Sequence, residues 1–391
     1  MGMRHCFADC LLDTDSLTLT RSGALVRVEP QVFDLIRLLV ENAGRVVTRD
    51  EIVETVWNGR IVSDSAISAR IAGARKALGD DGKAQRVIRT VARRGLQLVA
   101  AVDHTPATSV SAPVRAPQEQ RIRYASDAQG RSIAWALTGA GPPLFRLGYN
   151  TTHLEAEWHT PCERTAFDRL ADHLTLLRYD PVGFGMSDRS DITADFAVMA
   201  ENALRAADAA GLDRFALFSE SGGVHTALHL AAAHPDRVCK LVIAGGYVDG
   251  RKRRGADLPE TFHALVSEAW DTPDSPFAAA LLYPYFPEGP IEAVQAMGRN
   301  MQAAASKANE LSIRSAIDRI SNADLLPRIQ CPTLIVHARH DRVHPLSEAR
   351  KLATGIPQAE LMIQDSANHV PIPGNPHYDA YLDAIIRFVL A

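Results

Sequence analysis

Residues 215–223 read FALFSESGG, and this stretch decides the fold of the larger part of the chain. The apolar run Phe215–Phe218 predicts a buried strand, which passes through small residues directly into a predicted helix. A tight strand-to-helix turn exposes a serine hydroxyl and points the helix N-terminus at a developing oxyanion. Such a turn requires small residues two positions before and after the nucleophile. Gly223 meets this requirement after Ser221, and Ser219 replaces the usual glycine before it, so Ser221 is the candidate nucleophile.

The two partners that a catalytic serine needs follow later in the chain. Asp341 lies in a D-x-x-x-P turn just after one predicted strand, and His369 lies just after another. A histidine oriented by this aspartate would take the proton of the serine. We therefore expect a catalytic triad of Ser221, Asp341 and His369, with Asp365 as a less favoured alternative acid.

The sequence offers little that could hold a metal or another cofactor. His337, His340 and His344 crowd the turn around Asp341, but no second cluster of ligands accompanies them. The five cysteines are scattered along the chain and form no Cys-x-x-Cys pair: Cys6, Cys10, Cys162, Cys239 and Cys331. Such cysteines predict small buried thiols, and neither a disulfide framework nor a zinc site. We expect no metal and no cofactor.

Strands alternate with helices on both sides of the serine turn. The sequence predicts a helix over about 194–210 and strands over these ranges: 122–124, 133–138, 144–147, 174–179, 215–218, 333–336 and 360–363. This alternation is typical of a mostly parallel sheet with helices on both faces. The fold class of this part of the chain is therefore α/β.

From Leu144 to the C-terminus the chain resembles the α/β-hydrolase superfamily. The resemblance rests on the serine turn, on its two partner turns, and on the motif GYNTTHLE at 148–155, which follows the third strand. It extends over about 121–391. It implies an oxyanion hole made by the backbone N–H groups of Tyr149 and Gly222.

The same resemblance places a helical cap over about 249–326. This segment opens with the basic run Arg251–Arg254 and then carries these aromatic residues: Phe262, Trp270, Phe277, Tyr283, Tyr285 and Phe286. Such aromatic side chains either line a pocket for an apolar acyl or ring group or pack the cap onto the rest of the domain. The sequence leaves both interpretations open.

A proline-rich stretch separates this domain from a smaller N-terminal part. Residues 103–120 read DHTPATSVSAPVRAPQEQ, hold three prolines and show no apolar periodicity. This composition predicts a flexible or semi-extended linker. We expect an N-terminal domain at 1–101, a linker at 102–120 and the α/β domain at 121–391.

The N-terminal part predicts short strands, then helices, then a hairpin. A helix over about 30–42 is followed by a capping box, Thr48-x-x-Glu51, which opens a second helix. A third helix begins near Ser63, and its apolar stripe falls on these residues: Ile67, Ile71, Ala74 and Leu78. Short strands and helices of this kind form a small α+β domain.

These elements resemble the winged helix-turn-helix domain of OmpR/PhoB-type regulators, on the motifs LVENAGRVVTRDEIVETVW, VSDSAISARIAGARKALG and VIRTVARRG. The resemblance implies that the third helix enters the DNA major groove while the hairpin, or wing, holds the flanking backbone or minor groove. By position, these residues would face DNA: Ser65, Ser68, Ala69, Arg70, Ala72, Gly73, Lys76, Arg93 and Arg94. Leu96-Gln97 replaces the family's usual Tyr-Arg, so one wing contact is not expected here. The alternative is a winged helix used for protein contacts alone.

Charge is distributed unevenly along the chain. Residues 1–100 carry 15 basic and 12 acidic side chains, a net +3, whereas the whole chain of 391 residues has a net charge of −4. A basic segment on an acidic protein favours a polyanion such as DNA as its partner. No run approaches the roughly 18 apolar residues of a membrane span, and the first residues lack the apolar core of a signal peptide. We therefore expect a cytoplasmic protein without a membrane partner.

The two resemblances together predict a transcription regulator that binds double-stranded DNA. Its hydrolase domain would sense, and slowly hydrolyse, a small ester, lactone or related carbonyl ligand. The alternative is a serine hydrolase, an esterase or lactonase, with an accessory winged helix. A scaffold that uses both folds only as interaction surfaces is a third, less favoured hypothesis. Winged helices commonly read paired half-sites, which is compatible with a homodimer.

Overall fold

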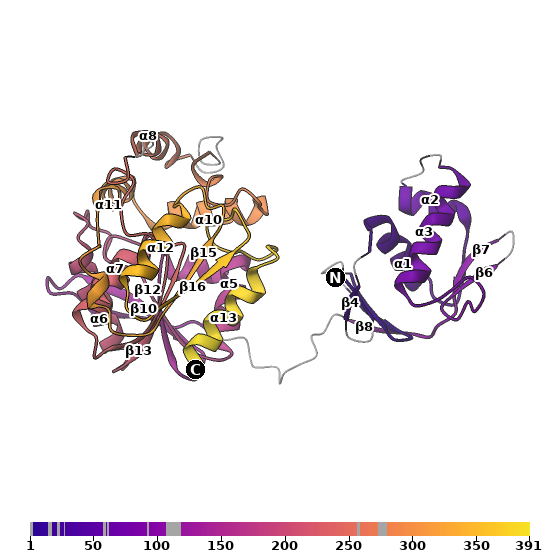
Figure 1. The fold of residues 1–391 in the computed structure, drawn as a ribbon, viewed down its shortest axis with the longest axis horizontal. Coiled ribbons are helices and arrows are strands. Elements are labelled where there is room, and N and C mark those ends of the chain that lie inside the picture. Colours follow the sequence, from indigo (N-terminus) through magenta and orange to yellow (C-terminus); the bar gives the residue numbers. More distant parts are fainter. Residues whose placement is uncertain are drawn as a thin grey trace. The chain divides into compact units, whose positions relative to one another are not determined.

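The computed structural model describes residues 3–14, 18–21, 24–26, 28–57, 60, 62–91, 94–106, 119–255, 259–272 and 280–391. The chain divides into two compact units, Met1–Ala116 and Pro117–Ala391, which the colours of Figure 1 distinguish along the sequence. Among the described residues, no helix combines the length and the apolar character that crossing a membrane requires.

The N-terminal unit contains an antiparallel sheet with the strand order β4-β3-β2-β1-β8. Its strands are β1 (Met3–Phe7), β2 (Cys10–Asp13), β3 (Thr18–Arg21), β4 (Ala24–Val26) and β8 (Val102–Pro106). β8 pairs with β1 from Phe7 opposite Val102 to Met3 opposite Pro106. The predicted start of the linker at 102 is therefore wrong, because 102–106 form part of this sheet. β8 lies at the edge of the sheet beside β1, and its sequence, VDHTP, has no apolar alternation that would predict a strand.

Helices and a small second sheet complete this unit. The elements are α1 (Pro30–Glu41), β5 (Val46–Val47), α2 (Arg49–Trp57), α3 (Asp64–Ala77), β6 (Ile88–Val91) and β7 (Gly95–Leu98), and the sheet order is β5-β7-β6. The predicted capping box is confirmed: the Thr48 N–H donates to Oε2 of Glu51 at 2.7 Å, and the Glu51 N–H donates to Oγ1 of Thr48 at 3.3 Å. Both sheets and all three of these helices contribute to one apolar core.

The turn between α3 and β6 is held together by Asp80. Its buried carboxylate accepts the backbone N–H groups of Asp81, Arg86, Val87 and Ile88 at 2.8 to 3.0 Å. Although burial opposes the shift, these hydrogen bonds hold the pKa of Asp80 below its ordinary value. One carboxylate thus positions the strand β6, which begins the wing.

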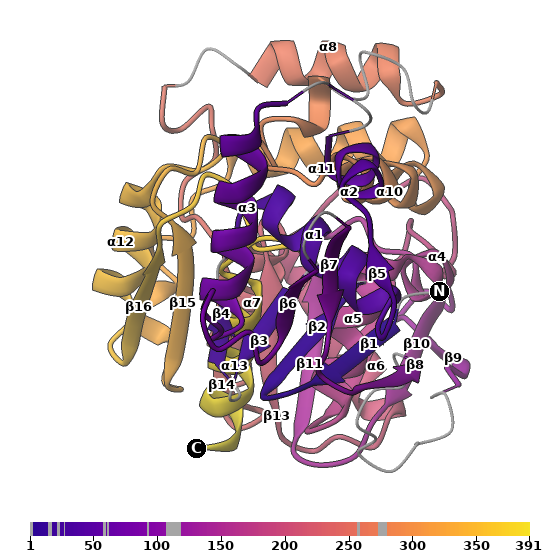
Figure 2. The ribbon, with the colours of Figure 1, turned by 90° about the vertical axis from the view of Figure 1, so that its right-hand side faces the viewer.

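The C-terminal unit is built on a sheet with the strand order β16-β15-β14-β13-β11-β12-β10-β9. The strands are β9 (Ile122–Ser126), β10 (Ser132–Thr138), β11 (Pro143–Gly148), β12 (Thr175–Tyr179), β13 (Phe215–Glu220), β14 (Val238–Ala244), β15 (Thr333–Ala338) and β16 (Ala359–Gln364). The strands β11 to β16 are mutually parallel, and β9 and β10 form an antiparallel edge. Figure 2 shows β15 and β16 at the opposite edge.

Helices cover both faces of this sheet. α6 (Phe196–Ala209), α7 (Gly223–Ala233) and α12 (Leu346–Gly355) pack on one face, and α5 (Pro161–Ala171) and α13 (Tyr378–Leu390) pack on the other (Figure 1). In a parallel sheet the carboxyl ends of the strands meet at one edge. The segments that follow β11, β13, β15 and β16 therefore come together there, and each of them carries a predicted catalytic group.

Between β14 and β15 the chain leaves the sheet and forms the helices of the cap. These are α8 (Pro259–Ala269), α10 (Ile291–Ala304) and α11 (Lys307–Arg319), and a 3-10 helix at Leu326–Arg328 leads back to the sheet. α8 lies farthest from the sheet in both views (Figures 1 and 2). The Trp270 indole donates to the carbonyl oxygen of Ala305 at 2.9 Å and so ties the segment after α8 to the end of α10.

Replacing Asp80 with alanine should destabilise the N-terminal unit by about 3 kcal/mol, because buried N–H groups lose a charged acceptor. We expect weaker hydrogen-exchange protection of the β6 and β7 amides in the full-length chain. The pKa of Asp80 is lowered in the folded state, so its contribution is present at neutral pH and is lost as the pH falls through that lowered pKa. Glu54→Ala, an exposed acidic position on α2, is the matched control. Unchanged protection in Asp80→Ala would contradict the role given to this carboxylate.

Candidate active site

Ser221 lies in the turn between β13 and α7, where the backbone is strained. Its φ of 50° falls in the left-handed region that residues with a side chain rarely adopt, and its N–H donates to the carbonyl oxygen of Ala244 at 2.9 Å. A Cβ at Gly223 would lie 2.0 Å from the carbonyl oxygen of Gly148, so only glycine fits there. The small residue noted in the sequence is therefore required by the close approach of β11.

Asp341 and His369 meet behind this turn. Nδ1 of His369 lies 2.7 Å from Oδ2 of Asp341, and both side chains are buried. The other oxygen of Asp341 accepts the backbone N–H groups of Val343 at 2.7 Å and His344 at 3.0 Å. Burial opposes ionisation, but the contact with His369 and these hydrogen bonds hold the pKa of Asp341 below its ordinary value. Asp341 is thus fixed as an anion that orients His369.

His369 lines a pocket together with Ser221, and Asp341 leaves its second ring nitrogen, Nε2, unused. Within the described residues, its Nε2 is buried and has no hydrogen-bond partner. The predicted alternative acid, Asp365, instead lies near Arg339 and His340, and its side chain is 76% exposed. The geometry therefore favours Asp341 as the residue that orients the histidine.

The other histidines near Asp341 have separate partners. Nε2 of His337 lies 2.9 Å from the carbonyl oxygen of His344 and 3.5 Å from Asp341. His344 stacks on the ring of Tyr247 with 3.6 Å between the ring centroids. In the part of the chain that the structure describes, no group of three or more His, Cys, Asp or Glu side chains is arranged to hold a metal ion.

One pocket is lined by two members of the predicted triad, Ser221 and His369, and by both residues of the predicted oxyanion hole. Its volume is about 810 Å³ with the open mouth included, and the residues that line it include Tyr149, Ser221, Gly222 and His369. The cap supplies most of the apolar wall, through Leu282, Tyr285, Phe286, Met297, Met301, Ile313 and Ile317. The pocket thus offers an apolar surface next to the serine.

The cap aromatics divide between the two roles that the sequence left open. Tyr285 and Phe286 line the pocket. Phe262 and Trp270 pack in a separate apolar cluster of the cap, and Tyr283 is 56% exposed. Phe277 lies outside the described residues. In the basic run at the start of the cap, Arg251 pairs with the buried Asp318 of α11 at 2.7 Å. This ion pair joins the start of the cap to α11.

The loop after β11 carries a residue that the sequence analysis did not single out. Asn150 follows Tyr149, lines the pocket and has a φ of 95°. A Cβ at Gly222 would lie 2.7 Å from Nδ2 of Asn150 and 3.3 Å from the carbonyl oxygen of Tyr149. The two segments predicted to form the oxyanion hole are therefore in close contact. The motif GYNTTHLE contains this asparagine, but the sequence does not show its left-handed backbone, which only the structure reveals.

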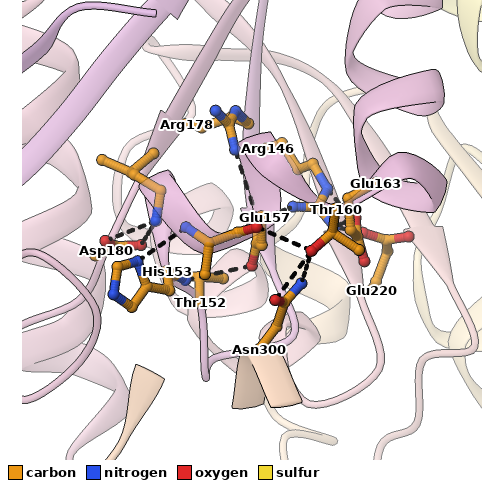
Figure 3. A network of polar contacts seen from close by, with 12 residues as sticks. Arg146, Thr152, His153, Glu157, Thr160, Glu163, Arg178, Asp180, Glu220 and Asn300 are labelled. Carbon is orange, nitrogen blue, oxygen red and sulfur yellow. Dashed lines mark hydrogen bonds and ion pairs between the residues drawn. The ribbon is translucent and has the colours of Figure 1, made fainter. Parts of the chain in front are cut away.

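A buried group of charged side chains lies under the same loop (Figure 3). The sequence pattern did not reveal this group. Arg146 donates to Glu220 at 2.9 Å, to Glu157 at 3.3 Å and to Glu163 at 3.3 Å. Nη1 of Arg178 lies 3.6 Å from Glu157. All five side chains are buried. We call Arg146, Arg178, Glu157, Glu163 and Glu220 the charged cluster. Glu220 precedes Ser221 directly, so this cluster sits at the base of the nucleophile turn.

Two members of the charged cluster reach the pocket wall. Glu157 and Glu163 line the pocket. Glu163, Tyr149 and Met297 also line a second cavity of about 400 Å³. Burial raises the pKa of Glu163 to about 8; Arg146 acts against this, and the neighbouring carboxylates Glu157 and Glu220 add to it. Glu163 is thus the member of the cluster whose charge is least compensated.

The cap is bonded directly to the loop that carries His369. The His369 N–H donates to the carbonyl oxygen of Tyr285 at 2.7 Å. Glu288 accepts from the Ser366 hydroxyl at 2.6 Å and from the Ala367 N–H at 2.9 Å, and its own N–H donates to the side chain of Asn368 at 2.9 Å. The segment at 285–288 is therefore tied by hydrogen bonds to the loop of the predicted catalytic histidine.

In the N-terminal unit, α3 presents most of the predicted DNA-facing residues to solvent. The exposed ones are Ser65, Ser68, Ala69, Ala72, Lys76 and, on the wing, Arg94. Arg70 instead pairs with Glu29 at 2.7 Å and donates to Gln31 at 2.9 Å, both at the start of α1. Arg93 lies outside the described residues.

Gly73 is placed differently from the prediction. A Cβ at this position would lie 3.0 Å from Cγ2 of Val32 on α1, so Gly73 faces the neighbouring helix rather than the exposed side of α3. The close approach that the glycine permits is therefore between two helices of the domain, and the helical spacing alone could not reveal which side was crowded.

Known proteins resemble each unit separately. The family described as "Transcriptional regulatory protein, C terminal" matches residues 23–98. The Escherichia coli "Transcriptional activator CadC" is 33% identical over 85 residues, which are 22% of this chain and 17% of that protein. The N-terminal unit is thus an OmpR/PhoB-type DNA-binding domain of transcription regulators, although the chain spans only about one sixth of that relative.

The family described as "alpha/beta hydrolase fold" matches residues 154–376, more than half of the chain. A Caulobacter "Putative carbamate hydrolase RutD" is 26% identical over 231 residues, which cover 56% of this chain and 82% of that protein. A crystal structure of a hydrolase from Pseudomonas aeruginosa superposes with a TM-score of 0.58 and 25% identity, covering 69% of this chain and 99% of that one. The chain therefore belongs to the α/β-hydrolase fold family, and it carries an OmpR/PhoB-type DNA-binding domain at its N-terminal side.

Proposed function

We propose that this protein is a ligand-responsive transcription regulator whose hydrolase domain senses, and slowly hydrolyses, a small ester, lactone or related carbonyl compound. One observation carries the proposal. His369, held by Asp341 at 2.7 Å, has a buried Nε2 without a partner in the described residues, and it lines the same pocket as Ser221. A domain that only bound a ligand would not need these three groups together.

The chemistry follows from this arrangement. Nε2 of His369 accepts the hydroxyl proton of Ser221 as the serine oxygen attacks the carbonyl carbon of the ligand. The negative charge that develops on the carbonyl oxygen is stabilised by the backbone N–H groups of Gly222 and Tyr149. His369 then returns the proton to the leaving oxygen, and water hydrolyses the acyl-serine by the same steps. Asp341 stabilises the imidazolium throughout.

The pocket and the relatives support a carbonyl ligand of modest size. An apolar cap wall beside Ser221 suits a small organic acyl or ring group. The Caulobacter relative is named for carbamate hydrolysis, which is also attack on a carbonyl. Slow turnover would reset a sensor after its ligand has been detected.

The cap offers a route from ligand to signal. Leu282, Tyr285 and Phe286 contact the pocket, and the segment that follows them is bonded to the loop of His369 through Glu288. A ligand that displaces this wall would shift the cap and the catalytic loop together. Such a shift changes DNA affinity only by as much as the ligand prefers one arrangement over the other. This function also requires that the protein share a compartment with DNA.

The nucleophile is tested with a fluorophosphonate probe and a nitrophenyl ester. Ser221→Ala should abolish labelling and ester hydrolysis, because the attacking oxygen is removed. Ser219→Ala is the matched control two residues away. The Ser219 hydroxyl is buried without a partner among the described residues, so its removal should leave labelling intact and stability equal or higher. Labelling that persists in Ser221→Ala would contradict the assigned nucleophile.

DNA binding is tested on a duplex of random sequence at several salt concentrations. Lys76→Ala should weaken binding and reduce the slope of log K against log salt by about one, because one phosphate contact is lost. Lys252→Ala removes the same charge from the hydrolase domain, where it pairs with Glu260 at 2.9 Å, and should leave the slope unchanged. Equal effects of the two variants would count against the assigned DNA-facing surface.

The alternative, a serine hydrolase with an accessory winged helix, is favoured by the same triad geometry. The two hypotheses differ in whether an occupied pocket alters DNA binding. Protein labelled at Ser221 with the fluorophosphonate carries a stable adduct in the pocket. We expect its DNA affinity to differ from that of unlabelled protein by several-fold, and Ser221→Ala treated with the same probe, which it cannot bind covalently, serves as the mock control. Identical affinities would favour the accessory role.

A further inference from the structure

The pocket wall contains one more buried carboxylate than the nearby cations balance. In the charged cluster, three carboxylates face two guanidinium groups, Arg146 and Arg178. The other charged pair in the pocket is balanced, because Nε of Arg314 donates to Glu310 at 2.5 Å. An uncompensated buried carboxylate is costly, so it takes up a proton or meets a cation.

The contacts show which of the three carboxylates is least compensated by the arginines. Glu220 has the closest contact with Arg146, at 2.7 Å, and also accepts from the Tyr381 hydroxyl at 3.3 Å. Glu157 is contacted by both arginines. Among the described residues, Glu163 forms its ion pair with Arg146 alone, at 3.3 Å, through the same nitrogen that contacts Glu220. Glu163 is therefore the weakly paired member of the cluster.

Glu163 is also the member best placed to meet a ligand. It lines both the main pocket and the second cavity. The second cavity is also lined by Tyr378, whose hydroxyl is buried and has no hydrogen-bond partner in the described part of the chain. A carboxylate and an unpaired hydroxyl that share one cavity form a pair of acceptors for an N–H donor.

The rest of the wall suits a cation rather than an anion. The aromatic rings of Tyr149, Tyr285 and Phe286 line the same pocket, and aromatic faces attract ammonium groups. The pocket's own arginine, Arg314, already has Glu310 as its partner. An anionic ligand would therefore meet the excess carboxylate without a free guanidinium to offset it.

We propose that the ligand of this pocket is an ester or related carbonyl compound that carries a protonated amine, and that Glu163 binds this amine while Ser221 faces the carbonyl. This inference rests on the proposed function of the pocket and adds the chemical class of its ligand. The raised pKa of Glu163 agrees with it, because the carboxyl holds a proton until a cation replaces it.

The test measures binding without turnover. Ser221→Ala protein is titrated calorimetrically with methyl esters of ω-amino acids of increasing chain length. Each is compared with the alkanoate ester in which a methyl group replaces the ammonium and with the ω-hydroxy ester. We expect the best ammonium ester to bind at least about tenfold more tightly than both neutral partners, the ratio that corresponds to one charged hydrogen bond.

Matched variants locate the effect. Adding Glu163→Gln to Ser221→Ala should remove the preference for the ammonium ester, whereas adding Glu260→Gln, an exposed carboxylate on α8, should preserve it. The proposal is overturned by equal binding of charged and neutral esters, by no binding of any of them, or by a preference that survives in Glu163→Gln. Labelling of Ser221 by the fluorophosphonate is independent of these results, so the proposed function and this inference fail separately.

A second readout does not depend on the folding of a Glu163 variant. Binding of the ammonium ester at pH 7 should release close to one proton from protein with Glu163 intact, because the cation lowers the raised pKa of Glu163. The number of protons follows from calorimetry in buffers of different ionisation enthalpy. The titratable and charged groups around Glu163 are Arg146, Tyr149, Glu157, Cys162, Arg178, Glu220 and Tyr378. Proton release that is absent, or equal for the neutral ester, would overturn the proposal.

Discussion

Gly223 approaches the carbonyl oxygen of Gly148 so closely that a Cβ at position 223 would lie 2.0 Å from it. This approach joins the start of α7 to the end of β11. Because Tyr149 follows Gly148 directly, the same contact sets the turn of Ser221 beside the loop expected to supply the oxyanion hole. The parallel order of the strands from β11 to β16 then brings Asp341 and His369 to this edge of the sheet. This backbone contact and the parallel strand order together place the predicted catalytic groups at one edge of the sheet.

The base of this turn is unusual because it is ionic. Arg146 on β11 and Glu220 on β13 are buried neighbours in adjacent strands, and α4 (Leu154–His159) and α5 supply Glu157 and Glu163. A buried ion pair is not by itself strong evidence for stability, because desolvation offsets much of its attraction. The arrangement is better explained by the pocket above it, where a net carboxylate at the wall gives the site a chemical preference that an apolar floor would lack.

The sensing and the hydrolysis that we propose would use the same parts of the hydrolase domain. The cap residues that line the pocket are followed by Glu288, which is bonded to the loop of His369 at Ser366 and Ala367. The cap wall of the pocket and the loop of His369 are therefore linked by hydrogen bonds. In the proposed function this link would let one domain both report an occupied pocket and remove the ligand, next to a DNA-binding domain.

The sequence by itself determined the features that depend on local spacing and chain order. These are the capping box at Thr48, the helix that starts after Ser63, the strand-to-helix turn at Ser221, and the order of serine, acid and histidine along an α/β chain. Each is visible because its physical cause lies within a few residues or in the alternation of elements.

Only the tertiary structure decided the features that depend on contacts between distant segments. β8 gains its partner from β1, at the other end of the domain, and Gly73 faces Val32 on a different helix. The charged cluster draws on residues from 146 to 220, and the pairing that leaves Glu163 least compensated exists only after β11, β12, β13 and two helices have packed together. Charge balance in a buried site is a sum over neighbours in space, and a single sequence does not list those neighbours.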